Sequence, residues 1–228
     1  MAKFKIKLID KNDVAKDTMA FRFAKPSGYV FAAGQHTGWT LINPAHTDAE
    51  GNARTFSFAS APHEDFLMIA SRLRDTAFKR VLHNLPAGRQ VEIEEPFGDM
   101  ILHSDSKRPA VLIAGGIGIT PFRSIVLDAA HRHLAHQIFL FYSNRTPQDA
   151  PFLDELQSVD GFKFKLIPVF TEESGHITSD LLKKHVSDLT KPVFYLAGPT
   201  KFVLAIRNLL TSSGVDDLSI KSEEFEGY

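Results

Sequence analysis

The segment AGGIGITPFR, residues 114–123, is the stretch whose residue types most directly suggest chemistry. It follows the apolar run AVLI and precedes a helical pattern, and its glycines let the backbone approach a ligand without Cβ clashes. A helix that begins here points free N–H groups and the positive end of its dipole at an anion. Pro121 stands where the usual dinucleotide fingerprint has a third glycine, which argues against the ordinary Rossmann assignment. The segment is therefore either a phosphate cradle or a tight structural turn.

A second candidate lies at the end of the next apolar run, where QIFLFYSNR closes with Ser143, Asn144 and Arg145. In dinucleotide-binding domains that prefer NAD, an acidic residue near this point holds the ribose 2′-hydroxyl. A hydroxyl, an amide and a guanidinium suit a 2′-phosphate instead, because an arginine–phosphate contact is charge-assisted and often bidentate. The alternative is that Arg145 is a solvated loop residue.

A third candidate is RTFSFAS, residues 54–60, which combines a cation, an aromatic ring and a hydroxyl in one expected strand. Strand alternation places Arg54 and Phe56 on one face and Ser57 on the other. An arginine beside an aromatic ring suits a flat ligand that carries phosphate. Taken alone, the segment is better explained as an ordinary barrel strand with a phenylalanine in the core and an arginine in solvent.

Three histidines, His131, His133 and His136, lie close together in the sequence and are candidate metal ligands. Only His133 and His136 share a helical face, and no carboxylate or cysteine completes a ligand set. The sequence therefore predicts a surface histidine cluster and no metal site.

The elements that position these residues fall into two halves. Short alternating β-prone pieces separated by Gly, Pro, Asn and Asp dominate the first half, with one helical pattern at residues 75–85. Apolar β-prone runs alternate with helical patterns from about residue 109 onward, which indicates a parallel sheet. The charged stretch HSDSKRP, residues 103–109, is the expected seam, the boundary between the two halves. We therefore predict a β-barrel domain at residues 1–104 and an α/β domain at residues 105–228.

Composition narrows the function classes. The chain has 228 residues, 43% of them hydrophobic, and a formal net charge of −1, so no field favours nucleic acid or an anionic membrane. It has no cysteine, which excludes disulfides, thiolate zinc sites, cysteine nucleophiles and cysteine-held iron–sulfur clusters. No apolar run approaches membrane-spanning length and the N-terminus lacks the apolar core of a signal peptide. We therefore expect a cytoplasmic protein that neither binds nucleic acid nor inserts into a membrane.

Five segments together carry a family resemblance: AGQHTGWTL (33–41), RTFS (54–57), EEPFGDM (94–100), GGIGITP (115–121) and YLAGP (195–199). In order and spacing this set resembles the ferredoxin–NADP+ reductase superfamily, in which a flavin-binding antiparallel Greek-key β-barrel precedes a nicotinamide-binding α/β domain. The resemblance covers nearly the whole chain and implies FAD and NADP as cofactors, with NAD as the other possible coenzyme.

The resemblance also implies roles for individual residues. Ser57 would hydrogen-bond near flavin N5 and the terminal Tyr228 would cover the flavin face, so these two are the implied catalytic residues. In the first half, the implied cofactor-binding residues are Arg54, Thr55, Phe56, Ser57, Ile69, Ala70, Ser71, Thr76, Ala77 and Phe78. In the second half, they are Gly115, Gly116, Ile117, Gly118, Thr120, Pro121, Ser143, Arg145, Gly198, Pro199 and Tyr228. One departure is Ala197, which replaces the Cys of the family's Cys-Gly-Pro motif.

The implied function is that of an FAD-dependent NAD(P)H oxidoreductase. Hydride would pass from NADPH to the flavin, and electrons would then leave singly for an external acceptor, such as a small electron-carrier protein or an oxygenase component. Two alternatives stay open at this point: an NADH-using reductase component of an oxygenase system, and a non-catalytic module that senses a dinucleotide or serves assembly.

Overall fold

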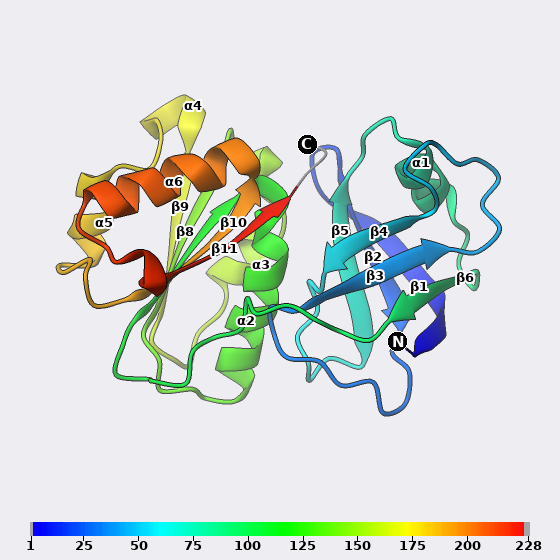
Figure 1. Cartoon of the computed structure of the whole chain (residues 1–228), viewed down its shortest axis with the longest axis horizontal. Coiled ribbons are helices and arrows are strands. Elements are labelled where there is room, and N and C mark those ends of the chain that lie inside the picture. Colours follow the sequence, from blue (N-terminus) through cyan, green and yellow to red (C-terminus); the bar gives the residue numbers. More distant parts are fainter. Residues whose placement is uncertain (1, 226–228) are drawn as a thin grey trace.

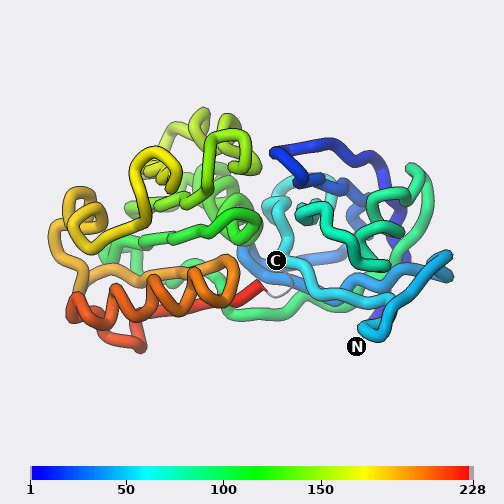
Figure 2. Tube along the Cα trace, turned by 90° about the horizontal axis from the view of Figure 1, so that it is seen from above, coloured from blue at the N-terminus to red at the C-terminus, as the bar shows by residue number. Residues whose placement is uncertain are grey.

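The computed structural model describes residues 2–225 of the chain. Two sheets lie side by side along the longest axis, and they remain separate in the perpendicular view (Figures 1 and 2). Strands up to Glu94 form the first sheet and strands from Ala110 onward form the second. Among the described residues, no helix has both the length and the apolar character that crossing a bilayer requires.

The first sheet has six antiparallel strands in the order β4-β3-β6-β1-β2-β5. They are β1 (Lys3–Ala15), β2 (Thr18–Ala24), β3 (His36–Leu41), β4 (Ala53–Ser57), β5 (Phe66–Arg72) and β6 (Gln90–Glu94). The segment after β4 reaches β5, because the Ala59 N–H donates to the Met68 carbonyl at 2.7 Å. This contact joins the two ends of the sheet, so the predicted antiparallel, barrel-like first half is confirmed.

Side chains from alternate strand positions fill the interior of this barrel. Ile6 and Leu8 of β1 and Phe21 and Phe23 of β2 are buried, and the Trp39 ring lies 5.0 Å from the Phe23 ring. The lysines that alternate with Ile6 and Leu8 are exposed. Because side chains alternate with a period of two, this burial pattern fixes which face of each strand points inward.

Helix α1 (Ala77–Asn84) follows β5 and is the one helix assigned between the described strands β1 and β6. Its N-cap is Thr76, whose side chain accepts the backbone N–H of Lys79 at 3.3 Å. Phe78 and Leu82, four residues apart on one face, pack into the barrel core. The helix start is thereby held in place beside β4 and β5.

The second sheet is parallel, with the strand order β11-β10-β7-β8-β9. Its strands are β7 (Ala110–Gly115), β8 (Ile138–Asn144), β9 (Phe164–Phe170), β10 (Val193–Pro199) and β11 (Ile220–Phe225). Its helices are α2 (Ile119–His131), α3 (Leu153–Gln157), α4 (Thr171–Ser174), α5 (Ser179–His185) and α6 (Thr200–Ser212). Short 3₁₀ turns occupy Gly116–Gly118, Pro147–Asp149 and Asp217–Ser219. The predicted α/β second half is therefore confirmed.

Both faces of the parallel sheet are covered. On one face, Leu112, Leu140 and Tyr195 pack with residues of α2 and α3. On the other face, Phe141 and Phe194 pack with residues of α5 and α6. Burial on both sides explains why these strands are continuous apolar runs rather than alternating patterns.

The connection between the sheets, residues 95–109, contains the expected seam. The His103 N–H donates to the Tyr195 hydroxyl at 2.8 Å, and the Arg108 side chain donates to the carbonyls of Lys191 and Pro192 at 2.9 and 3.1 Å. The seam is thus attached to the second sheet. The division into residues 1–104 and 105–228 stays a prediction.

Arg123 of α2 ties the two halves together, although it is only 4% exposed. It donates to Glu155 of α3 at 2.7 and 2.6 Å, and across the interface to Glu64 at 3.0 Å and to the Ala59 carbonyl at 2.6 Å. Burial opposes the charge, but the hydrogen bonds to Glu155 and Glu64 outweigh it and raise the pKa of Arg123. The next residue, Ser124, donates to the Ser60 carbonyl at 2.7 Å.

The predicted surface cluster of three histidines is wrong, because they do not share a helix and one of them is buried. Helix α2 ends at His131, and His133 adopts a left-handed backbone with φ of 50°, so the three histidines do not share a helix. His136 is buried, and its Nε2 lies 2.8 Å from the His103 carbonyl. His131 instead stacks on His63, with ring centroids 4.0 Å apart. Within residues 2–225, no group of three or more His, Cys, Asp or Glu side chains has the arrangement of a metal site.

Replacing Arg123 with methionine tests the interface. We expect Arg123→Met to lower the free energy of unfolding by about 3–5 kcal/mol, because removing one partner leaves Glu64 charged and largely buried. The pair of Lys191 and Asp188, whose side chains are 74% and 42% exposed, is the control, and Lys191→Ala should cost about 0.5 kcal/mol. Urea unfolding measures both, and equal losses in the two variants would contradict the assigned role.

Candidate active site

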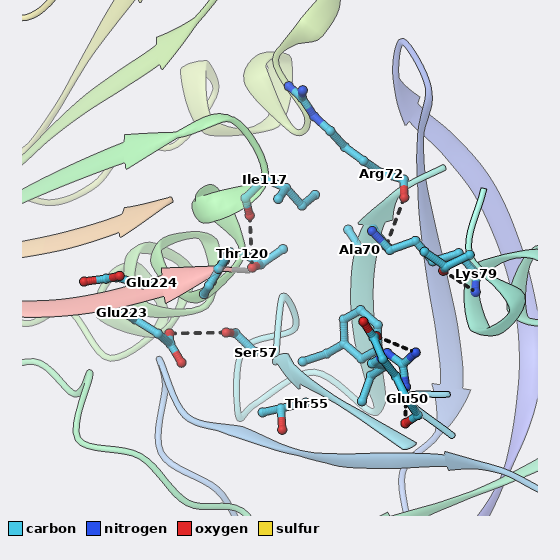
Figure 3. Close-up of a pocket in the computed structure, with 15 residues that line it drawn as sticks. Glu50, Thr55, Ser57, Ala70, Arg72, Lys79, Ile117, Thr120, Glu223 and Glu224 are labelled. Atoms are coloured by element: carbon cyan, nitrogen blue, oxygen red, sulfur yellow. Dashed lines mark hydrogen bonds and ion pairs between the residues drawn. The ribbon is translucent and has the colours of Figure 1, made fainter. Parts of the chain in front are cut away.

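A cavity of about 580 Å³ lies between the two halves (Figure 3). Strands β4 and β5 and the start of α1 line it from the barrel, and the glycine turn and the end of β11 line it from the parallel sheet. It contains nine residues that the sequence singled out: Arg54, Thr55, Phe56, Ser57, Ala70, Ser71, Thr76, Ile117 and Thr120. The remaining lining residues are Glu50, Arg72, Lys79, Glu223, Glu224 and Phe225.

Arg54 and Phe56 lie on the same side of β4, as alternation predicts. The Arg54 guanidinium is 5.2 Å from the centroid of the Phe78 ring of α1, and the Phe56 ring is 5.8 Å from it at an interplanar angle of 32°. Phe78 itself is buried in the barrel core. The core aromatic of α1 therefore supports both a cation and a second ring at the cavity wall.

Two carboxylates already engage the Arg54 guanidinium. Glu50 lies 2.8 Å and Asp48 3.2 Å from its Nη2. The other oxygen of Asp48 accepts the backbone N–H of Ala77, the first residue of α1, at 3.2 Å. Burial opposes ionisation of Asp48, but hydrogen bonds from Arg54 and from the N–H groups of Glu50 and Ala77 outweigh it and lower the pKa of Asp48.

A polar contact crosses the cavity from one half to the other. The Ser57 hydroxyl of β4 donates to Glu223 of β11 at 3.3 Å, and the two side chains point toward each other in Figure 3. The other Glu223 oxygen lies 2.6 Å from Nδ1 of His36 in β3. The edge of the His36 ring packs on Phe97, with centroids 4.3 Å apart. A hydroxyl, a carboxylate and an imidazole thus form a connected polar group at the domain boundary.

The glycines of this turn give a ligand access to the backbone, and the packing around them also leaves no room for a Cβ. A Cβ at Gly118 would lie 2.2 Å from the Ala197 carbonyl oxygen, and a Cβ at Gly115 would lie 2.8 Å from the Phe202 ring. Gly116 has φ of 56°, a conformation that L side chains rarely adopt. The turn and the start of α2 are thereby pressed against the end of β10.

Unpartnered polar atoms gather beside this turn. A Cβ on Gly116 would lie 3.1 Å from Nη2 of Arg72, so the guanidinium of this barrel residue sits over the turn of the other half. The Arg72 Nε is buried, and within residues 2–225 it has no hydrogen-bond partner. Asn144 at the end of β8 is 5% exposed, and neither polar atom of its amide finds a partner in that same part of the chain. Buried amides and guanidinium groups normally have partners, so these donors fit a polar ligand.

Ser143 and Arg145 lie at the end of β8, outside the cavity. Ser143 is buried, whereas the Arg145 side chain is 74% exposed. The Arg145 guanidinium contacts Glu172 of α4 at 2.9 and 3.2 Å. Arg145 is therefore close to a carboxylate that the sequence did not associate with it.

Several other predicted site residues do not line the cavity. Ile69 packs in the barrel core, because it faces the opposite side of β5 from Ala70. The remaining predicted residues outside the lining are Ala77, Phe78, Gly115, Gly116, Gly118, Pro121, Gly198 and Pro199. Tyr228 lies outside the described residues.

Comparison with known proteins finds reductases among those that this chain is similar to. Residues 112–208 match the family described as the oxidoreductase NAD-binding domain. Reductase component 1 of terephthalate 1,2-dioxygenase from Comamonas sp. is 27% identical over 93% of this chain and 65% of its own length. The chain spans between 58% and 65% of the length of the curated relatives it matches first.

Two solved structures share the whole fold. Flavohemoglobin from Malassezia yamatoensis, with bound FAD and heme, superposes with a TM-score of 0.82 and 25% identity, over 99% of this chain and 60% of that one. A ferredoxin NADP+ reductase from Neisseria gonorrhoeae, with bound FAD and NADP, superposes with a TM-score of 0.81 and 20% identity, over 97% and 98% of the two chains. The arrangement of a barrel followed by a parallel α/β sheet is thus shared along the full length.

The packing requirement at the turn can be measured. We expect Gly118→Ala to lower the free energy of unfolding by about 1–3 kcal/mol, because the new methyl group would meet the fixed backbone of Ala197. Gly38→Ala is the control, since its Cβ would meet only the end of the Glu94 side chain, which can rotate away. That control should change stability by less than about 1 kcal/mol. Equal effects of the two substitutions in urea unfolding would show that the turn has room to spare.

Proposed function

We propose that this chain, a member of the ferredoxin–NADP+ reductase superfamily, is a flavin-dependent oxidoreductase that carries electrons from a nicotinamide dinucleotide to an external acceptor. The observation that carries the proposal is the cavity itself, because the barrel and the α/β half each contribute one side of it. Ser57 and Glu223 meet there across the boundary. A reaction between two cofactors requires this kind of shared site, in which the protein aligns donor and acceptor.

The barrel side of the cavity fits FAD. Arg54 of β4 offers a guanidinium, and Thr76 and Lys79 at the start of α1 offer a hydroxyl and an ammonium, which suit phosphate. Phe56 offers an aromatic face for the isoalloxazine ring. When bound, FAD would accept hydride from the nicotinamide and release the electrons one at a time. Ser57 would then hydrogen-bond the ring, and Glu223 would orient Ser57 and keep a polar wall at the boundary.

The second half fits the nicotinamide dinucleotide. The turn at residues 115–118 brings backbone close to a ligand, and Arg72 supplies a cation over it. Asn144 offers a buried amide at the end of β8. These groups would hold the pyrophosphate and a ribose. The match of residues 112–208 to an NAD-binding domain supports this assignment.

The acceptor is proposed to be an electron-carrier protein or an oxygenase component. The terephthalate dioxygenase relative is named as a reductase component of such a system, which supports this class of partner. A cytoplasmic location remains a prediction from the sequence.

One spectrum tests the proposed function. Purified protein supplied with FAD should show flavin absorption bands, and NADPH or NADH added without air should bleach them. Protein that retains no flavin, or flavin that neither coenzyme reduces, would contradict the proposal. Ferricyanide turnover on the same samples distinguishes a reductase from a module that binds dinucleotide without chemistry.

Coenzyme choice is predicted to depend on Arg145 and its partner Glu172. We expect Arg145→Ala to weaken NADPH binding by about 1.5 kcal/mol, the lower end for hydrogen bonds to charged groups because the site is exposed. NADH, which lacks the 2′-phosphate, should bind unchanged. Glu172→Gln should strengthen NADPH binding, because it removes a competing carboxylate from the same guanidinium. Titration with both coenzymes measures this, and equal losses for NADH and NADPH in Arg145→Ala would refute a 2′-phosphate contact.

A further inference from the structure

The cationic end of the cavity is already compensated by acidic groups of the chain itself. Arg54 and the N–H of Ala77 are the donors that a flavin pyrophosphate would use, and Asp48 contacts both, at 3.2 Å in each case. Glu50 adds a second carboxylate at 2.8 Å from the same guanidinium. Figure 3 shows Glu50 directed at this end of the cavity.

The other terminal nitrogen of Arg54 is also engaged. Its Nη1 donates to the carbonyls of Glu50, Gly51 and Ala53 at 3.0, 3.2 and 2.7 Å. The guanidinium therefore bonds the β3–β4 loop on both sides. An N–H group donates fully to one acceptor at a time, so a phosphate oxygen and the Asp48 carboxylate exclude each other at Ala77.

The loop that carries these carboxylates lies at the surface of the barrel. Residues 45–50 are almost all exposed, and Glu50 has 75% of its side chain in solvent. Glu50 is the more exposed of the two carboxylates, and an exposed ion pair is weak, so Glu50 can exchange partners at modest cost. The cations, by contrast, belong to β4 and α1, which the barrel core holds in place.

We propose, on the basis of the function proposed above, that Asp48 and Glu50 are affinity-setting residues that compete with the flavin pyrophosphate for Arg54 and the start of α1. FAD binds by exchange with these carboxylates, so its affinity is lower than the cations alone would allow. A flavin without phosphate meets no such competition. The two residues thus set how strongly the site favours a dinucleotide flavin over riboflavin.

Equilibrium binding of FAD and riboflavin to flavin-stripped protein, followed by quenching of flavin fluorescence, tests this. Asp48→Asn retains an oxygen that can accept the Ala77 N–H but removes the charge, so the fold should persist. We expect this variant to bind FAD about five- to tenfold more tightly, given the strength of an exposed ion pair and the added repulsion between carboxylate and phosphate. Glu50→Gln should give a smaller gain in the same direction, and riboflavin affinity should stay constant in both.

Asp105→Asn is the matched control. It removes the same charge from an exposed turn outside the cavity, where Asp105 accepts the Lys107 N–H at 3.0 Å. It should leave the affinity for both flavins unchanged.

Three results would overturn the inference. Unchanged or weaker FAD binding by Asp48→Asn would make Asp48 a neutral or supporting residue. An equal gain for riboflavin would mean that the substitution acts through packing, and an equal gain in Asp105→Asn would mean that it acts through net charge. A wild-type protein that binds neither flavin would instead reject the proposed function, and this inference with it.

Discussion

The buried guanidinium of Arg123 is the contact on which the placement of the two halves depends. It compensates Glu64 from the barrel side and Glu155 from the α/β side, and it also satisfies the Ala59 carbonyl. A charge taken out of water is stable only when such partners are complete, so the two halves can meet in essentially one way at this point. The cavity follows from that placement, because neither half encloses it alone. The pairing of Ser57 with Glu223 is likewise possible only while the interface holds.

The architecture could be predicted because periodicity in a sequence records burial. The alternation of apolar residues with lysines at Phe4, Ile6 and Leu8 indicates a strand with one solvent-exposed face, and β1 has that pattern. The run IFLFYSN indicates a strand covered on both faces, and every residue of β8 is buried. The start of α1 could also be predicted, because Thr76 is a hydroxyl residue just before a helical pattern.

The site was less predictable, since it depends on register and on contacts between distant residues. In β5 the choice between Ile69 and Ala70 as the wall residue rests on which face meets the other half, and neighbouring strand positions look equally apolar. Glu223 lies 166 residues from Ser57, so no local pattern could pair them. The acidic stretch around Asp48 did carry a signal. It lies just before Arg54 between two expected strands, where a hairpin brings opposite charges together.

Ala197 shows how the α/β half can supply polar chemistry without the cysteine of the family motif. Ala197 is fully buried, and its carbonyl packs against Gly118, so this position sets the height of the glycine turn. In the parallel sheet its direct neighbour on the next strand is Glu223. From β11, Glu223 reaches Ser57 and His36 across the boundary, so the carboxylate at this level of the sheet comes from β11 and not from β10. The geometry of the boundary thus depends on how β11 pairs with β10.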